Sequence, residues 1–176
     1  HVEEGTPFYQ RLAGGDLSLP SEEFQTEMFE TAWAKLKQAG YEHYEISNFA
    51  LPGFQSRHNQ RYWEGKEYLG IGAGAHSFLR TGWGIRRANI SDPLLYMKSA
   101  KSIGYEEKLK KEEAIEEAIF LGLRQRGGID IMSFEERFGL TLTPYPPSLE
   151  GLLMEEKGRL KLTAQGILLA NEVFLR

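Results

Sequence analysis

The chain has 176 residues, enough for one domain of ordinary size or for two small ones. Hydrophobic residues make up 41% of it and aromatic residues 12%, so we expect a buried core rather than disorder. The net charge of −4 predicts no nucleic-acid partner, and the lack of cysteine excludes disulfides, thiolate zinc sites and, within this chain, a cysteine-ligated iron–sulfur cluster.

The N-terminal residues 1–10 show neither an initiator methionine nor the layout of a signal peptide. No run of about 18 apolar residues occurs in the sequence, so no membrane span is predicted. We therefore expect a cytoplasmic protein and interpret the chain as a fragment or domain of a longer one. Residues 3–20 are rich in glycine, proline and serine, which predicts a loop with one helical turn at 8–12.

A helix is predicted after this loop. Ser21 is the expected N-cap, two glutamates follow in the first turn, and Gly40 is the expected stop. Apolar residues recur at helical spacing between 24 and 39, and we interpret this stripe as core packing.

The next residues, 41–48, alternate with a period of two, which predicts a short strand. A helix, a glycine and a strand form half of an α/β repeat, so the predicted fold class is α/β with a parallel sheet or barrel. In such folds polar groups at the C-terminal ends of strands carry the chemistry, and here that end is 47–50.

The segment 55–63 places polar side chains among large aromatic rings. His58 and Asn59 are suited to bind a metal or a planar ligand, and Tyr62 and Trp63 to stack on that ligand. The alternative is a surface loop held by side-chain hydrogen bonds, which composition alone favours. Because no second His, Asp or Glu lies at helical or hairpin spacing from His58, we do not expect a closed metal centre.

The segment 68–78, YLGIGAGAHSF, is dense in glycine. Positions 70–75 match the loose dinucleotide fingerprint G-x-G-x-x-A, but no long apolar strand precedes it and no helix follows, so we do not expect a Rossmann site. We expect instead a strand at 68–71 and a loop in which glycine lets the backbone approach a ligand or another strand closely. His76 would then lie at the C-terminal rim of the sheet.

The remaining chain is predicted to be mainly helical. Residues 81–89 can return as a hairpin, Asp92 opens a helix to about 101, and a charged linker is expected at 105–111. The block after the linker is predicted to contain a helix around 115–123 stopped at 127–128, a helix at 134–138 capped by Ser133 and ended by Gly139, a third helix at 149–156, a strand at 158–162, and a final helix capped by Thr163 and running to about 175.

This order of elements is a winged-helix pattern, a class that often binds DNA. Residues 110–176 contain 9 Lys and Arg against 11 Asp and Glu, counted from the sequence. A DNA reader needs a basic face to displace counterions from phosphate. A structural or protein-contact role is therefore favoured for this block.

Three long motifs resemble the oxygen-independent coproporphyrinogen III oxidase-like family of radical S-adenosylmethionine (SAM) proteins. They are EISNFALPG at 45–53, SRHNQRYW at 56–63 and YLGIGAGAHS at 68–77. The pattern His-Asn-x-x-Tyr-Trp in the second motif resembles the heme chaperone branch of the family. Shorter matches near both ends of the chain extend the resemblance over nearly all of it; they lie at 4–7, 121–124, 127–130 and 162–166.

The resemblance implies the C-terminal portion of a protein about twice as long. Residues 1–104 would be the C-terminal part of a partial (β/α) radical-SAM barrel with its following sheet, and residues 105–176 a mostly helical, winged-helix-like domain. The family's N-terminal half supplies the Cys-x-x-x-Cys-x-x-Cys loop for a 4Fe-4S cluster, so this chain alone is expected to be inactive. Its expected partners are that missing barrel half, heme or a porphyrinogen, and a second copy at the exposed sheet edge.

The resemblance also implies candidate site residues. Those on the SAM side are Gly72, Gly74, Ala75 and His76. Those for heme are His58, Asn59, Tyr62 and Trp63. The imidazole of His58 would ligate the heme iron, Asn59 would orient it, and the two rings would pack on the macrocycle.

The function implied is heme handling. Because the oxidases proper carry a different pattern at 58–63, heme transfer by a chaperone is favoured over oxidative decarboxylation of coproporphyrinogen III. An alternative from another class is a winged-helix interaction module whose binding surface lies in 110–176.

Overall fold

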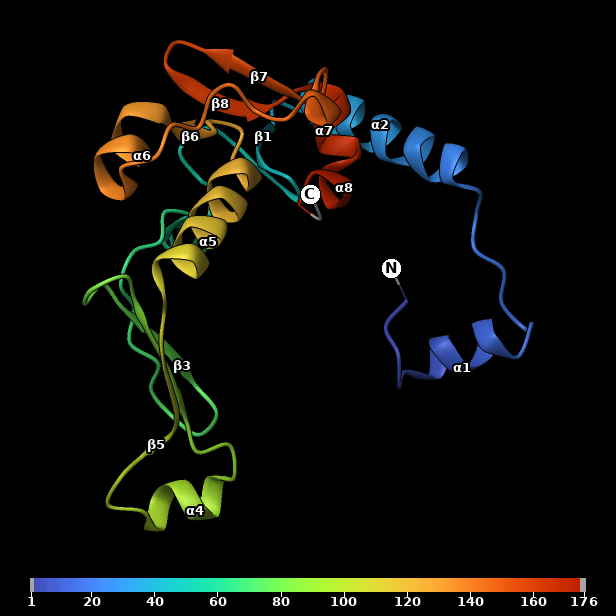
Figure 1. The fold of residues 1–176 in the computed structure, drawn as a ribbon. Coiled ribbons are helices and arrows are strands. Elements are labelled where there is room, and N and C mark those ends of the chain that lie inside the picture. The colour runs from blue at the N-terminus through green and yellow to red at the C-terminus, as the bar shows by residue number, and fades with distance from the viewer. Residues whose placement is uncertain (1, 175–176) are drawn as a thin grey trace. The chain divides into compact units, whose positions relative to one another are not determined.

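A computed structural model describes residues 2–174 of the chain, which divides into two compact units, His1–Gly40 and Tyr41–Arg176. The first unit contains α1 (Pro7–Ala13) and α2 (Glu22–Gln38), both traced in Figure 1. Ser21 caps α2 as predicted, because its Oγ accepts a hydrogen bond from the backbone N–H of Phe24 at 3.3 Å.

The apolar stripe of α2 does not form the predicted core. None of the residues of α2 is buried, and Phe24 and Met28 are each 53% exposed. Within α2 the rings of Phe29 and Trp33 form an edge-on pair, with centroids 6.0 Å apart. Helical periodicity therefore predicted the helix correctly, but it did not predict that the apolar residues of the helix are exposed.

The second unit begins with a two-stranded hairpin of β1 (Glu42–Glu45) and β2 (Asn48–Ala50). The strand predicted at 41–48 is thus shorter and turns back on itself. All strand pairs among residues 2–174 are antiparallel, so the predicted parallel sheet is wrong for this chain. The turn between β1 and β2 forms because the Glu45 carboxylate accepts a hydrogen bond from the Ser47 N–H, a local contact that alternation does not reveal.

A three-stranded antiparallel sheet follows, in the order β3 (His76–Leu79), β4 (Ile85–Asn89), β5 (Ile103–Lys108). The predicted hairpin return is confirmed by β3 and β4. Between β4 and β5 lies α4 (Pro93–Lys98), capped by Asp92 as predicted but ending three residues earlier than 101. The charged linker predicted at 105–111 is wrong, because most of it is strand.

The charges in β5 explain that error. Glu106 pairs with Arg87 of β4, with 2.6 Å between carboxylate oxygen and Nε, and Glu107 pairs with Arg86 at 3.4 Å. Opposite charges facing each other across neighbouring strands stabilise a sheet. The charged residues that predicted a linker therefore lie on a strand, where they form ion pairs with the neighbouring strand β4.

The C-terminal part combines helices with a second three-stranded sheet (Figure 1). Its elements are α5 (Lys111–Arg124), β6 (Ile129–Asp130), α6 (Ile131–Phe138), the 3-10 turn η1 (Pro147–Leu149), β7 (Leu153–Glu156), β8 (Arg159–Leu162), α7 (Ala164–Leu168) and α8 (Ala170–Phe174). The strands lie in the order β6-β8-β7, and β8 confirms the strand predicted at 158–162. The third helix predicted at 149–156 is wrong, since Leu153–Glu156 pairs with β8.

The caps in this part are mostly as predicted. Thr163 caps α7 and Gly139 ends α6 in a left-handed conformation, with φ of +65°. The cap of α6 is Asp130 rather than Ser133, whose N–H donates to the Asp130 carboxylate at 2.9 Å. The final helix breaks at Leu169 into α7 and α8, and its predicted end at 175 lies outside the described residues.

The core is concentrated in the C-terminal part. Apart from Ala50 and Phe78, the buried hydrophobic residues of the described chain lie between Leu109 and Val173. The domain boundary predicted between 104 and 105 stays a prediction, and it would fall inside β5. No helix within residues 2–174 is long and apolar enough to cross a membrane.

Gly128 fixes the approach of the chain to β8. Its φ is +66°, and a Cβ at this position would lie 2.2 Å from the carbonyl oxygen of Leu160. Any larger residue must push the two backbones apart at the start of β6, so the register of the second sheet depends on this glycine.

We expect Gly128→Ala to lower the free energy of unfolding by about 3 kcal/mol, because the added Cβ meets the Leu160 carbonyl and alanine resists a positive φ. Urea denaturation measures the change. Gly151→Ala is the matched control, because Gly151 also has a positive φ (+80°) but has open space where its Cβ would lie. The control should lose about 1 kcal/mol. Equal losses in the two variants would contradict the close approach.

Candidate functional site

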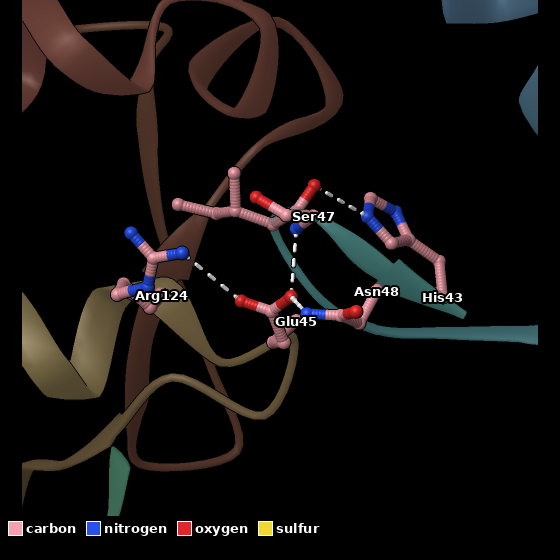
Figure 2. Close-up of polar contacts among 6 residues, drawn as sticks. His43, Glu45, Ser47, Asn48 and Arg124 are labelled. Atoms are coloured by element: carbon pink, nitrogen blue, oxygen red, sulfur yellow. Dashed lines mark hydrogen bonds and ion pairs between the residues drawn. The ribbon is translucent and has the colours of Figure 1, made fainter. Parts of the chain in front are cut away.

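A buried carboxylate lies at the centre of the segment that carries the first motif. The Glu45 side chain is 0% exposed. One oxygen, Oε1, accepts hydrogen bonds from the Ser47 N–H at 2.8 Å and the Asn48 Nδ2 at 2.5 Å, and Oε2 accepts from Arg124 Nη2 at 3.2 Å (Figure 2). Burial of a charge is costly unless such donors and an opposite charge surround it, and here both are present.

The backbone reinforces this contact. The N–H of Ile46 donates to the Arg124 carbonyl at 3.0 Å, and the N–H of Arg126 donates to the Tyr44 carbonyl at 3.1 Å. An isolated antiparallel bridge joins Glu45 to Gln125. The β1–β2 hairpin is therefore attached to the C-terminal end of α5 by both side-chain and main-chain bonds.

His43 packs on the other side of the turn, as Figure 2 shows. Its ring stacks on Phe49 with 4.3 Å between centroids, and its Nε2 lies 2.9 Å from the Ile46 carbonyl oxygen. A carbonyl only accepts, so Nε2 carries the proton in this bond. Burial lowers the pKa of His43, and the hydrogen bond to Ile46 opposes that shift in part.

The second motif forms a helix, α3 (Arg57–Trp63), so the surface-loop interpretation of this segment is wrong. Ser56 caps the helix, since its Oγ accepts from the Asn59 N–H at 3.2 Å. That cap was readable from the sequence. The polar composition of the following residues hid the helix.

One helical turn brings two of the heme candidates together. His58 and Tyr62 meet edge to face, with 4.9 Å between ring centroids, and Tyr62 meets Tyr68 in the same manner at 4.5 Å. His58 is exposed, and Asn59 is half-buried with its N–H committed to the cap. The His58 imidazole is thus exposed to solvent and packs against Tyr62, which in turn packs against Tyr68.

Trp63 faces the C-terminal part instead. The guanidinium of Arg124 lies over its ring at 4.5 Å, and its carbonyl accepts from Gln125 Nε2 at 3.0 Å. Trp63 and Tyr62 also line a hollow of about 280 Å³ whose other walls include Tyr68. Of the four heme candidates, the structure brings His58 and Tyr62 together and places Trp63 against α5.

The third motif is a loop folded onto β4 rather than a strand. The predicted strand at 68–71 is reduced to an isolated bridge between Tyr68 and Phe78. Asn89 holds the loop, because its Nδ2 donates to the carbonyl of Gly72 at 2.8 Å and its N–H donates to that of Ala75 at 2.9 Å. No sequence signal singled out Asn89, since its partners lie on a loop whose path the sequence does not reveal.

The glycines of this loop have two different uses. A Cβ at Gly70 would lie 2.2 Å from the His76 carbonyl oxygen, so close packing of the chain on itself requires this glycine. Gly72 and Gly74 have φ of +108° and +69°, and at Gly72 nothing lies within 4 Å of the place a Cβ would take. His76 is exposed at the start of β3. The predicted SAM-side residues therefore lie on one continuous segment, a loop that leads into β3 and has open space at Gly72.

Residues 2–174 contain no cluster of three or more His, Cys, Asp or Glu side chains suited to hold a metal ion. A heme iron needs a single protein imidazole rather than such a cluster. His58 fits that role because it is exposed and lies edge-on to the ring of Tyr62.

Comparison with known sequences gives consistent matches. Residues 109–169 match the family model of the HemN C-terminal domain. The chain is 41% identical to the heme chaperone HemW of Lactococcus lactis and 38% identical to that of Bacillus subtilis, in both cases over 98% of the chain, and over 47% and 48% of those proteins. It is 35% identical to the mitochondrial radical S-adenosyl methionine domain-containing protein 1 of Bos taurus, over 99% of the chain and 40% of that protein. The chain spans about half the length of the curated relatives it matches.

Comparison with solved structures identifies the fold. The coproporphyrinogen III oxidase (HemN) of Escherichia coli, described as a radical SAM enzyme, superposes with a TM-score of 0.65 at 19% identity, over 89% of this chain and 41% of that one. The predicted α/β class is confirmed as part of that architecture. The chain itself contains helices and small sheets and no closed barrel in its described residues.

Glu45→Gln is expected to lower the free energy of unfolding by about 3 kcal/mol, because it leaves the Arg124 cation without its buried partner. Urea denaturation of the complete protein, as its gene encodes it, measures the loss. Glu106→Gln breaks an exposed pair with Arg87 and should cost less than about 1 kcal/mol. A Glu45→Gln loss no larger than the control's would show that the buried pair contributes little.

His43 predicts a pH dependence of stability. Because its pKa is lowered in the folded state, the unfolded chain binds the proton more readily, and the stability that the neutral ring provides is lost as the pH falls below about 6.5. His43→Gln keeps a donor for the Ile46 carbonyl and removes the titration. We expect the fall in melting temperature between pH 7.5 and 5 to be smaller in this variant. An identical fall would contradict the assignment.

Proposed function

We propose that the chain is the C-terminal portion of a radical SAM protein of the oxygen-independent coproporphyrinogen III oxidase-like family, in its heme chaperone branch, and that it binds heme and passes it on. The observation that supports heme binding best is the position of His58 on α3, exposed and edge-on to Tyr62. When bound, heme supplies an iron that accepts an imidazole nitrogen.

In this proposal, side chains on α3 and the neighbouring Tyr68 have different roles in binding heme. His58 would ligate the iron, because its side chain is exposed and a ring nitrogen is accessible. Tyr62 and Tyr68 form an aromatic base beside it, a surface suited to a flat apolar macrocycle. Asn59 orients the approach of the ligand next to His58.

The proposed SAM side is the loop with Gly72, Gly74, Ala75 and His76. Its open face at Gly72 suits close approach of a ligand to the backbone. This chain has no cysteine, so it supplies no thiolate to a 4Fe-4S cluster, and we assign cluster binding to the missing barrel half. That half is the proposed main partner, and the cytoplasm the proposed location.

Chaperone activity is preferred over oxidation of a porphyrinogen for one reason. The relatives at 38–41% identity over nearly the whole chain are heme chaperones, whereas the oxidase HemN is 19% identical and shares the fold alone. We also propose the division into 1–104 and 105–176; the match at 109–169 lies within the second part. Self-association of the isolated chain through an exposed strand edge remains a proposal, tested by light scattering.

We expect His58→Ala to shift the Soret band of the heme-loaded complete protein and to weaken heme binding by about tenfold or more, because the iron loses its protein ligand. Titration with hemin, followed by absorption, measures both. His76→Ala is the matched control, since it removes another exposed histidine and should leave the Soret band in place. A spectrum and affinity unchanged by His58→Ala would refute the assignment.

The radical SAM half of the proposal has a separate test. We expect the coding sequence upstream of His1 to contain a Cys-x-x-x-Cys-x-x-Cys loop, the ligand set of the family's cluster. Its absence would remove SAM chemistry from the proposal and leave heme binding by α3 as an independent question.

A further inference from the structure

The last residue of α3 is held by the C-terminal part in two ways. The indole of Trp63 lies under the Arg124 guanidinium at 4.5 Å, and the Trp63 carbonyl accepts from the Gln125 side chain at 3.0 Å. Both contacts come from consecutive residues, the last residue of α5 and its C-cap. One end of the short helix is therefore fixed while the other end, with His58, is exposed.

Arg124 is itself held in a fixed orientation. Its Nη2 lies 3.2 Å from the fully buried Glu45 carboxylate, and its guanidinium lies 5.7 Å from the centre of the Phe120 ring. A planar guanidinium can pair with a carboxylate and stack on a ring at the same time, which an ammonium group cannot do equally well. The Trp63 ring is thus packed against a group whose own position the buried ion pair determines.

This arrangement leaves one face of the Trp63 indole covered. The ring lies at the contact between α3 and α5, and the i, i+4 geometry of a helix places His58 and Tyr62 on a different side from Trp63. The helix has only seven residues, and His58 lies about 7.5 Å along its axis from Trp63. A small change of tilt at Trp63 consequently moves the imidazole.

We propose that Arg124 is a positioning residue for heme: by stacking on Trp63 it sets the direction in which α3 presents His58, so that the C-terminal domain determines the geometry of the heme ligand. Trp63 then serves as an anchor for the helix rather than as a surface for the macrocycle. This inference rests on the proposed heme function and deepens it, because it assigns a role in ligand geometry to residues that do not touch the iron.

Arg124→Lys in the complete protein tests the proposal, because lysine keeps a positive charge for Glu45 and loses the planar stack. In the heme-free variant we expect the backbone amides of residues 57–63 to exchange about fivefold faster, the factor that loss of one cation–π contact gives. In the heme-loaded variant we expect a shifted Soret band and about fivefold faster heme dissociation. Arg87→Lys, in an exposed pair with Glu106, is the matched control and should change neither.

A second pair of variants distinguishes a positioning effect from a general loss of stability. Trp63→Leu removes the ring and should reproduce both effects, whereas Trp63→Phe keeps an aromatic face for the guanidinium and should restore the wild-type spectrum. If Arg124→Lys and Trp63→Leu lower only the melting temperature, and α3 exchange and the Soret band stay unchanged, the positioning role is refuted.

The outcomes separate this inference from the function on which it rests. If the wild-type protein binds no heme, or if His58→Ala has no effect on the spectrum, the proposed function fails. If the wild-type protein binds heme through His58 while the Arg124 and Trp63 variants keep the wild-type spectrum and dissociation rate, the inference alone fails.

Discussion

The buried ion pair between Glu45 and Arg124 is the constraint on which the arrangement of the site depends. A fully buried carboxylate is tolerated only when donors and an opposite charge surround it, so the turn after β1 must stay in contact with the end of α5. The backbone bonds of Ile46 and Arg126 follow from the same contact. Two segments 79 residues apart in sequence are thereby joined, and α3 is packed against their junction.

This junction explains why the motif 56–63 has two kinds of residue. His58 is exposed and meets the half-buried Tyr62 one turn along α3, while Trp63 faces the guanidinium. The glycine loop is organised separately, by the Asn89 side chain and the backbone of β4. The two proposed ligand regions, for heme and for SAM, thus depend on different interactions, and a change in one need not disturb the other.

Local chemistry was predictable from the sequence, and pairings distant in sequence were not. The caps Ser21, Asp92 and Thr163 act within one turn of their own helices, and all three were predicted correctly. The strands β5 and β7 were missed, because their charged side chains find partners on neighbouring strands. In the site, resemblance identified His58 and the glycine loop as candidates. Arg124 and Asn89 escaped notice because their roles come from contacts that only the folded chain shows.

We propose that α3 presents His58 to heme while Trp63 holds the helix to the C-terminal part of the chain. The structure of the complete protein with bound heme, determined by crystallography, is the most direct test. We expect a His58 ring nitrogen at the iron, with the Trp63 indole still stacked on the Arg124 guanidinium. An iron bound by another residue, or a Trp63 ring turned away from Arg124 to lie on the macrocycle, would contradict it.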